Sequence, residues 1–334
     1  MFVREAYAQG SADLKYAGIK THELDASLLL AFVLKKDRTF IITANNEKIS
    51  DKYCAVYCEL IERRAGGECI AYLTGKKEFW GLEFLVNKAV LVPRPDTETL
   101  VETAIGLISH AETQAASAAN IKSKGRREEI KVLDLCTGSG AIAVSLKHEK
   151  PELEVYATDI CPNALKTAKE NAERLLGKNK IQFFLGDLFY AFSSPSPASA
   201  PSVSPPNLPE GNLDLWSRCR FRFEVCENSS TQKFALIISN PPYIPSAEIE
   251  TLSAEVQNEP RLALDGGACG LEIIKQIIDK VPNYLEQNGF LLLEADPRQM
   301  HEIQILLDKK GFKDIQLYND LSGLQRVIGG RYEK

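Results

Sequence analysis

Residues 132–143 have the sequence Val-Leu-Asp-Leu-Cys-Thr-Gly-Ser-Gly-Ala-Ile-Ala, which is typical of a strand, a glycine turn and the start of a helix. Its first half is an apolar run of strand length, and its second half begins a helix. Between them, Gly138 and Gly140 allow a tight backbone turn and the close approach of a ligand, because glycine has no Cβ. The pattern predicts a buried strand that ends in a glycine turn and continues as a helix.

The same alternation continues to the C-terminus. Strands are predicted near residues 131–135, 154–158, 181–185, 234–238, 289–294 and 313–318, and helices near 140–149, 162–176, 271–286 and 298–309. Alternating strands and helices indicate an α/β fold with a mostly parallel sheet and helices on both faces. Ligands of such sheets bind beyond the carboxyl ends of the strands.

Acidic residues stand at the ends of the first three predicted strands. Asp159 can accept hydrogen bonds from both ribose hydroxyls of an adenosine, and Asp187, followed by Leu188, can bind an adenine amino group. A glycine loop with one acid does not separate a nicotinamide cofactor from S-adenosylmethionine. Asp134 favours S-adenosylmethionine, because a carboxylate suits the ammonium of its methionine part and suits a pyrophosphate poorly. The alternative for each site alone is an ordinary turn.

A proline-rich loop follows the fourth predicted strand, with the sequence Asn240-Pro241-Pro242-Tyr243. Neither proline can donate a backbone hydrogen bond, so the strand must stop there. The side-chain oxygen of Asn240 and the nearby carbonyls are acceptors, and Tyr243 offers a flat wall. We expect this loop to hold a planar –NH2 group such as that of adenine, cytosine or a glutamine side chain; the alternative is a plain turn.

The N-terminal part is different in character. Residues 1–75 carry apolar positions at helical spacing and are predicted to form a helical domain, with Thr21 as one N-cap and a second helix from about Asp51 to Arg64. Residues 76–92 are predicted to form a linking β-hairpin, and residues 93–334 a second domain. Packing or partner binding is the simplest function for the helices.

An insertion at 190–233 interrupts the α/β pattern. Residues 193–212 are rich in proline and serine and cannot bury a core, so we expect them to be disordered. After them, Arg218, Arg220 and Arg222 alternate along a possible strand. This strand could bind RNA or acidic groups, although an edge strand with its charges in water is favoured.

The composition limits the function classes. The chain has 334 residues, of which 44% are hydrophobic and 25% charged, and its formal net charge of −5 counts against adhesion to duplex nucleic acid. No apolar run approaches the roughly 18 residues of a membrane span, and the N-terminus has no signal or transit composition. Eight scattered cysteines lack the spacing of a zinc site, so no metal is expected. We expect a cytoplasmic monomer that binds neither membranes nor nucleic acid directly.

Taken in order, these motifs resemble the class I S-adenosylmethionine-dependent methyltransferases, and more narrowly the protein-(glutamine-N5) methyltransferases of the release-factor type. The narrower resemblance rests on Arg63-Arg64-x-x-Gly67-Glu68, Tyr72-Leu-x-Gly75, Glu78-Phe79-x-Gly81, Val92-Pro-Arg-Pro-Asp-Thr-Glu98, Glu259-Pro-Arg-Leu-Ala-Leu-Asp-Gly-Gly267, Gly270-Leu and Arg326-Val. It covers nearly the whole chain apart from 111–129 and 190–233. It implies a Rossmann-like, mostly parallel sheet of seven strands, an N-terminal helical domain and a linking β-hairpin.

The resemblance also implies an activity: transfer of a methyl group from S-adenosylmethionine to the side-chain amide of the glutamine in the Gly-Gly-Gln motif of class 1 peptide chain release factors. The cofactor residues would be Asp134, Thr137, Gly138, Ser139, Gly140, Asp159, Asp187, Leu188, Asn240 and Thr97. The catalytic residues would be Asn240, Pro241 and Tyr243, and the substrate would contact these together with Pro242 and Phe79. The N-terminal helices would hold the release factor.

The chain departs from the family pattern at two places. Glu294-Ala-Asp-Pro-Arg-Gln299 replaces the usual Glu-x-Gly-x-x-Gln, which could alter local packing, and the 190–233 insertion is longer than usual, which could add a partner surface.

Three rival functions share parts of this pattern. A glutamine methyltransferase of a ribosomal protein would share the loop, but the matches at 63–81 and 92–98 favour the release-factor type. An adenine-N6 methyltransferase of DNA or RNA would use a similar loop on a flipped base, but normally needs a basic surface. A non-catalytic cofactor-binding partner would have no need of Asn240.

Overall fold

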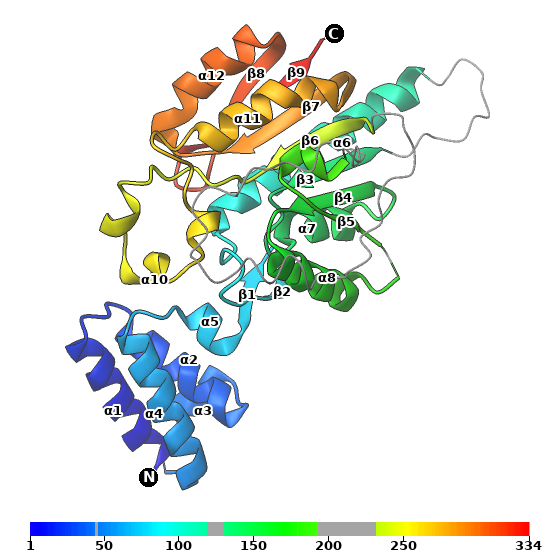
Figure 1. Ribbon diagram of the computed structural model, residues 1–334. Coiled ribbons are helices and arrows are strands. Elements are labelled where there is room, and N and C mark those ends of the chain that lie inside the picture. Colours follow the sequence, from blue (N-terminus) through cyan, green and yellow to red (C-terminus); the bar gives the residue numbers. More distant parts are fainter. Residues whose placement is uncertain (44–45, 119–129, 179, 193–231, 334) are drawn as a thin grey trace, which may run out of the picture. The chain divides into compact units, whose positions relative to one another are not determined.

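The computed structural model describes residues 1–43, 46–118, 130–178, 180–192 and 232–333 (Figure 1). The stretch expected to be disordered, 193–212, and the arginine-bearing strand at 218–222 lie outside these residues. Contacts group the chain into two units, Met1–Glu98 with Pro242–Ile273, and Thr99–Pro241 with Ile274–Lys334. The sequence placed 93–334 in one domain, whereas the contacts group Pro242–Ile273 with the N-terminal residues.

The first unit begins with five helices, as expected for residues 1–75. They are α1 Val3–Tyr16, α2 His22–Leu34, α3 Arg38–Thr43, α4 Asp51–Ala65 and α5 Ile70–Thr74. Their core contains Leu14, Leu30 and Tyr57, which come from α1, α2 and α4. Thr21 occupies the N-cap position of α2, but its hydroxyl donates to the Asp25 carboxylate at 2.9 Å instead of capping the backbone.

A short hairpin follows the helices. Strands β1 Lys76–Phe79 and β2 Leu82–Leu85 pair in antiparallel fashion, so strand structure ends earlier than residue 92. The turn places Trp80 at φ 54°, and the Trp80 backbone N–H donates to Glu98 Oε1 at 2.8 Å. The hairpin is therefore fastened to the start of α6 Glu98–Ala118.

Segment 242–273 completes the first unit with η3 Ile249–Thr251, α10 Ala254–Gln257 and η4 Arg261–Ala263. Two arginine–carboxylate contacts hold it. Arg64, only 2% exposed, donates to Asp25 at 2.7 Å and also to Glu255 of α10. The second is Arg94 to Glu259, and the same carboxylate accepts from the backbone N–H of Val92 at 3.1 Å. Charge pairs thus join segments that are distant in sequence.

Arg64→Leu is expected to lower the free energy of unfolding by about 3–5 kcal/mol, because it leaves the buried Asp25 carboxylate without its cation. Chemical unfolding followed by circular dichroism measures the change. The neighbouring Arg63, whose side chain is 42% exposed beside Glu68, provides the control. Arg63→Leu should cost less than about 1 kcal/mol, as a surface pair does. Equal losses of unfolding free energy in the two variants would show that the buried Arg64–Asp25 pair stabilises the fold no more than the surface pair does.

The second unit contains the seven-stranded sheet predicted by the resemblance. Its strands are, in spatial order, β5 Gln182–Leu185, β4 Glu154–Asp159, β3 Lys131–Leu135, β6 Phe234–Ser239, β7 Leu285–Glu294, β9 Gln325–Tyr332 and β8 Phe312–Asn319. The first five are parallel, and β9 runs antiparallel to both of its neighbours. The mostly parallel α/β fold is confirmed, although β9 was not recognised as a strand from the residues themselves.

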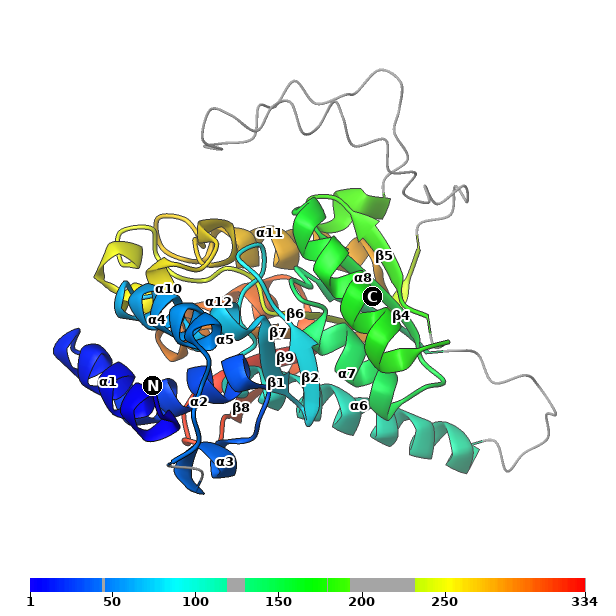
Figure 2. The same cartoon turned by 90° about the horizontal axis from the view of Figure 1, so that it is seen from below.

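Helices accompany the strands, as the alternation predicted. They are α7 Ala141–Glu149, α8 Pro162–Leu176, α11 Glu272–Lys280 and α12 Met300–Lys309, together with the short turns η2 Leu188–Phe192, η5 Val281–Asn283 and η6 Pro297–Gln299. Helices α7 and α8 pack on strands β3 to β5, and α12 packs on β8 and β9 (Figures 1 and 2). This arrangement leaves the strand ends as the place where loops from several strands meet.

The departure at 294–299 forms a regular helix start. Asp296 caps η6, since its carboxylate accepts from the backbone N–H of Arg298 at 2.8 Å and the Gln299 side chain accepts from the Asp296 N–H at 3.2 Å. Asp296-Pro297 therefore takes the place of Gly-x in the family pattern without disturbing the helix start, because proline suits the first helical position.

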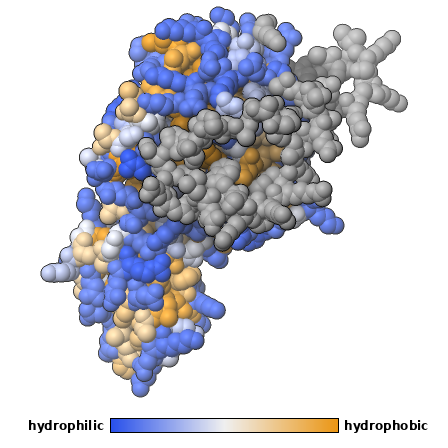
Figure 3. Space-filling model, viewed as in Figure 1, coloured by the Kyte–Doolittle hydropathy of each residue, from blue (hydrophilic) through white to orange (hydrophobic). Residues whose placement is uncertain are grey.

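On the coloured part of the surface in Figure 3, hydrophilic residues predominate, with hydrophobic residues between them. Among the described helices, none is long and apolar enough to cross a membrane.

Candidate active site

The glycine turn lies at the carboxyl end of β3. The Thr137 N–H donates to the carbonyl of Thr158 at 2.9 Å, which ties the turn to β4. Gly138 has a φ of 56°, and a Cβ placed on it would meet nothing within 4 Å. The positive φ favours glycine, and the open space beside it lets a ligand approach the backbone.

Asp134 lies beneath this turn and is fully buried. Its Oδ2 accepts from Thr137 Oγ1 at 2.6 Å and from the Ala143 N–H at 3.2 Å. Its Oδ1 is also buried, and among the described residues it has no hydrogen-bond partner. Burial raises the pKa of this carboxyl to about 7, against the two hydrogen bonds, which lower it. A buried acceptor without a donor is costly, so the site suits a ligand that brings a cationic donor.

Asp159 connects the glycine turn to α8. Its Oδ2 accepts from the Gly138 N–H and its Oδ1 from the Cys161 N–H, both at 2.8 Å. Burial raises the pKa of Asp159, while hydrogen bonds from backbone N–H groups lower it. Each carboxylate oxygen has capacity for a further hydrogen bond, so the pair can accept from two neighbouring hydroxyls.

The third strand end joins this group. The Gly186 N–H donates to the Asp159 carbonyl at 3.1 Å, which places the turn after β5 beside the turn after β4. The side chain of Asp187 is exposed, and Leu188 is buried at φ 49°. The structure thus brings together Asp134, Thr137, Gly138, Ser139, Gly140, Asp159, Asp187 and Leu188 at the ends of β3, β4 and β5.

Asn240 follows β6 at the same edge of the sheet. The Ser239 hydroxyl donates to the Leu135 carbonyl at 2.8 Å, which aligns the ends of β6 and β3. Asn240 is half-buried and Pro241 is buried. The loop crosses the boundary between the units, since Pro241 ends one segment of the second unit and Pro242 begins a segment of the first.

Two further predicted residues, Thr97 and Phe79, lie in the first unit, which also contains Pro242 and Tyr243. Thr97 is 4% exposed, and Phe79 is 1% exposed with its ring against Phe84, 6.0 Å between centroids. The Phe79 ring is therefore packed against Phe84 and does not present an open surface. The roles of both residues toward ligands stay predictions.

A packing contact that sequence reasoning missed supports the loop from within the first unit. The Ile244 N–H donates to the Leu264 carbonyl at 3.0 Å, and the Gly266 N–H donates to the Ile244 carbonyl at 2.9 Å. A Cβ on Gly266 would lie 2.8 Å from both the Pro242 carbonyl oxygen and the Tyr243 Cα. Gly266 thus packs directly against the backbone of Pro242 and Tyr243. In the sequence, this Gly-Gly pair was visible only as part of the resemblance.

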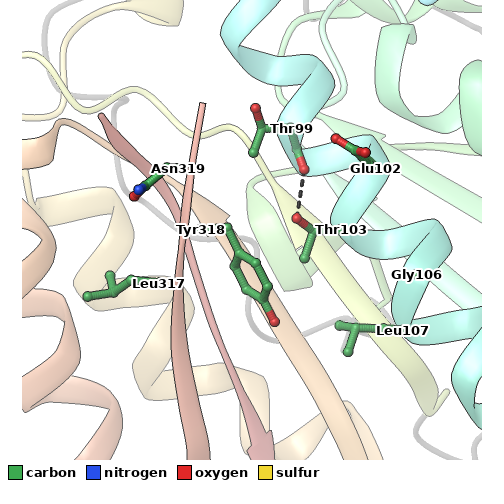
Figure 4. A pocket seen from close by; sticks show the side chains of 8 residues that line it. All are labelled: Thr99, Glu102, Thr103, Gly106, Leu107, Leu317, Tyr318 and Asn319. Atoms are coloured by element: carbon green, nitrogen blue, oxygen red, sulfur yellow. Dashed lines mark hydrogen bonds between the residues drawn. The ribbon is translucent and has the colours of Figure 1, made fainter. Parts of the chain in front are cut away.

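A separate pocket of about 500 Å³ lies between α6 and the edge strand β8 (Figure 4). It is lined by Thr99, Glu102, Thr103, Gly106, Leu107, Leu317, Tyr318 and Asn319. The Thr103 hydroxyl donates to the Thr99 carbonyl at 2.7 Å, so one polar side chain is already occupied. None of the predicted site residues lines it, and the strand-end site is the better candidate for catalysis.

Comparisons with known proteins agree with this arrangement. Residues 5–75 match the family model of the PrmC N-terminal domain, and residues 98–195 match the methyltransferase small domain. The chain is 32% identical to the release factor glutamine methyltransferase of Escherichia coli (strain K12), over 99% of this chain and 98% of that protein. It is 33% identical to the protein of that name from Koribacter versatilis, over 99% of each chain. The chain therefore belongs to the family of release factor glutamine methyltransferases.

Proposed function

We propose that this chain transfers a methyl group from S-adenosylmethionine to the side-chain amide nitrogen (N5) of the glutamine in the Gly-Gly-Gln motif of class 1 peptide chain release factors. The observation that carries the proposal is the similarity to release factor glutamine methyltransferases over 99% of the chain. Monomeric state and cytoplasmic location stay predictions.

The strand-end residues fit the cofactor. Asp134 Oδ1, buried and without a partner among the described residues, would accept from its ammonium. Asp159 would accept from the ribose hydroxyls, and Asp187 from the adenine amino group. The open space beside Gly138 leaves room for the cofactor to approach the backbone of the turn. Thr137, Ser139, Gly140, Leu188, Thr97 and Asn240 would complete the binding site. When bound, S-adenosylmethionine supplies the methyl group.

The Asn240 loop would bind and orient the glutamine amide. An amide nitrogen is a poor nucleophile because its lone pair is delocalised, so alignment and acceptors for its hydrogens matter more than a strong base. Asn240 Oδ1 and the Pro241 carbonyl would accept the two amide hydrogens, and Pro242 and Tyr243 would cover the amide plane. Fixing the reacting group in this way raises the rate of transfer.

Cofactor binding is expected to release a proton from Asp134. The folded-state pKa, about 7, lies above the unfolded value, so this carboxyl contributes stability below about pH 4 that is lost as the pH rises through about 7. A bound ammonium favours the ionised form, so affinity should increase up to about pH 7 and then level off. Calorimetry at pH 6.5 in buffers of different ionisation enthalpy measures the proton. The Asp134→Asn variant should bind S-adenosylmethionine weakly and release no proton. If the wild type took up a proton on binding, or released none, the assignment of Asp134 would be contradicted.

Asp159→Ala is expected to weaken S-adenosylmethionine binding by about 1.5–3 kcal/mol, the usual worth of a hydrogen bond to a charged group. The variant also frees the Gly138 and Cys161 N–H groups, so the glycine turn loses its anchor. Calorimetry gives the dissociation constant. Glu152→Ala, an exposed acid of the same unit, is the control and should bind normally. An unchanged constant for Asp159→Ala would place the ribose contact elsewhere.

The proposed function as a whole is tested with radiolabelled S-adenosylmethionine and four separate substrates: a release factor, a ribosomal protein, DNA and RNA. Label should enter only the release factor and should be lost when its Gly-Gly-Gln glutamine is changed to alanine. Label in the ribosomal protein or in nucleic acid would favour one of the rival activities.

A further inference from the structure

The helical unit carries a second pocket, of about 440 Å³, between α2, α4 and β1. Its lining includes four lysines, Lys35, Lys36, Lys52 and Lys76. We call it the lysine-rimmed pocket. None of the residues assigned above to the cofactor or to the glutamine lines it.

Three apolar side chains in this pocket remain open to solvent. Phe32, Tyr53 and Val56 are 44%, 43% and 40% exposed. Figure 3 shows hydrophobic surface beside hydrophilic surface on the helical unit. Single exposed apolar residues are common, but three gathered in one hollow with a polar rim are typical of a binding surface.

The charge of the pocket is opposite to that of the chain. No acidic residue is among its lining residues, whereas the whole chain has a formal net charge of −5. Lys76 already contacts Glu83 at 2.8 Å, but both side chains are about half exposed, and such surface pairs are weak. A local excess of positive charge around an apolar floor suits a negatively charged partner that also carries an apolar group.

We propose that the lysine-rimmed pocket receives an acidic segment of the protein substrate that carries an apolar side chain. This inference rests on the proposed function, because it takes the release factor as the partner. The apolar side chain fills the hollow beside Phe32, Tyr53 and Val56, and neighbouring carboxylates face the lysines. A polypeptide fits better than a nucleic acid, because lysine is a point charge and the floor includes aliphatic Ala31 and Val33 beside the rings.

A second contact of this kind has a catalytic consequence. The Asn240 loop can grip only one amide group, which is too small a surface to bind a protein tightly. A remote contact adds binding energy for the whole protein, and such uniform binding lowers KM without changing kcat. The intact release factor should therefore be a far better substrate than a short Gly-Gly-Gln peptide.

The first test reverses charge at two rim positions in the full chain. Lys36→Glu/Lys52→Glu should raise KM for the intact release factor at least tenfold at low salt, and leave kcat, cofactor affinity and activity on a Gly-Gly-Gln peptide unchanged. Lys15→Glu/Lys20→Glu is the matched control, since both lysines are exposed on the same unit and lie outside the pocket lining. An unchanged KM, or an equal rise in the control, would overturn the proposal.

The second test addresses the apolar floor. Phe32→Ser should raise KM for the release factor about fivefold or more, whereas Ile42→Ser should not, although Ile42 is more exposed at 63% and lies outside the lining. Measured melting temperatures are needed to check that both variants fold. Similar KM values for the two variants would remove the apolar contact from the proposal.

A binding measurement separates this proposal from the proposed function. A fluorescein-labelled acidic peptide with a central leucine should bind the wild type and the Lys15/Lys20 control, but bind Lys36→Glu/Lys52→Glu at least tenfold more weakly. That result would stand even if no label entered the release factor. If the pocket variants instead lost affinity for RNA and kept it for the peptide and the release factor, the pocket would be a nucleic-acid site and the proposal would fall.

Discussion

Asn240→Ala is expected to reduce the turnover of the intact release factor at least ~100-fold, because it removes an acceptor that aligns the glutamine amide; such acceptors and donors are typically worth about 3–4 kcal/mol in active sites. The affinity for S-adenosylmethionine should change little, because Asn240 would supply only one of the proposed cofactor contacts, while Asp134 and Asp159 keep theirs. Single-turnover kinetics and calorimetry measure the two quantities.

Two further variants sharpen this test. Asn240→Asp keeps an oxygen acceptor at the same position and should lose less activity than Asn240→Ala. Asn163→Ala, an exposed asparagine on α8, should behave as wild type. Near-normal turnover of Asn240→Ala would remove Asn240 from the catalytic assignment, while a matching loss of cofactor affinity would make it a binding residue only.

Gly266→Ala is expected to reduce turnover by about 100-fold with normal cofactor binding, since a displacement of about 1 Å near the reacting groups can cost that much. The added Cβ would lie 2.7 Å from the Gly270 carbonyl oxygen, and 2.8 Å from both the Pro242 carbonyl oxygen and the Tyr243 Cα. All three are backbone atoms, which cannot rotate away as a side chain can. Relief of the clash therefore has to move the Pro242-Tyr243 backbone or the Gly266 turn itself.

The control for Gly266 is Gly106, exposed in the middle of α6, where a Cβ would meet nothing within 4 Å. Gly106→Ala should stabilise the chain by about 0.5–1 kcal/mol and leave kinetics unchanged. For Gly266→Ala, kcat on both the peptide and the release factor is compared with the melting temperature and the cofactor dissociation constant. A lower melting temperature with unchanged kcat would show that Gly266 serves stability and not loop position.

The position of the three acids at strand ends could be predicted from the sequence because the signals are local, while their roles toward a ligand stay predictions. Asp134, Asp159 and Asp187 each follow an apolar run of strand length, and parallel strands end at the same edge of a sheet. The backbone partners of the carboxylates were not predictable in the same way. The N–H groups of Ala143 and Cys161 reach them only through the conformation of two turns.

What the sequence did not show is non-local. Strand β9 contains Gly329 and Gly330 and little apolar alternation, and it is defined by pairing with β7 on one side and β8 on the other. The grouping of Pro242–Ile273 with the N-terminal helices depends on partners such as Arg64 and Glu255, which no short pattern connects. The Gly-Gly turn at Gly266 was visible as a motif, but its contact with Tyr243 requires coordinates.

The Arg64–Glu255 contact has a consequence for how this chain folds while it is being synthesised. The two residues are separated by 191 positions, and a ribosome adds about 5–20 residues per second, so Glu255 leaves the ribosome roughly 10–40 s after Arg64. During that interval Asp25 is already available to pair with the Arg64 guanidinium, but Glu255 of α10 is not yet available. The N-terminal helices can form early, but their unit is completed only after β3 to β6, four of the seven sheet strands, have been synthesised.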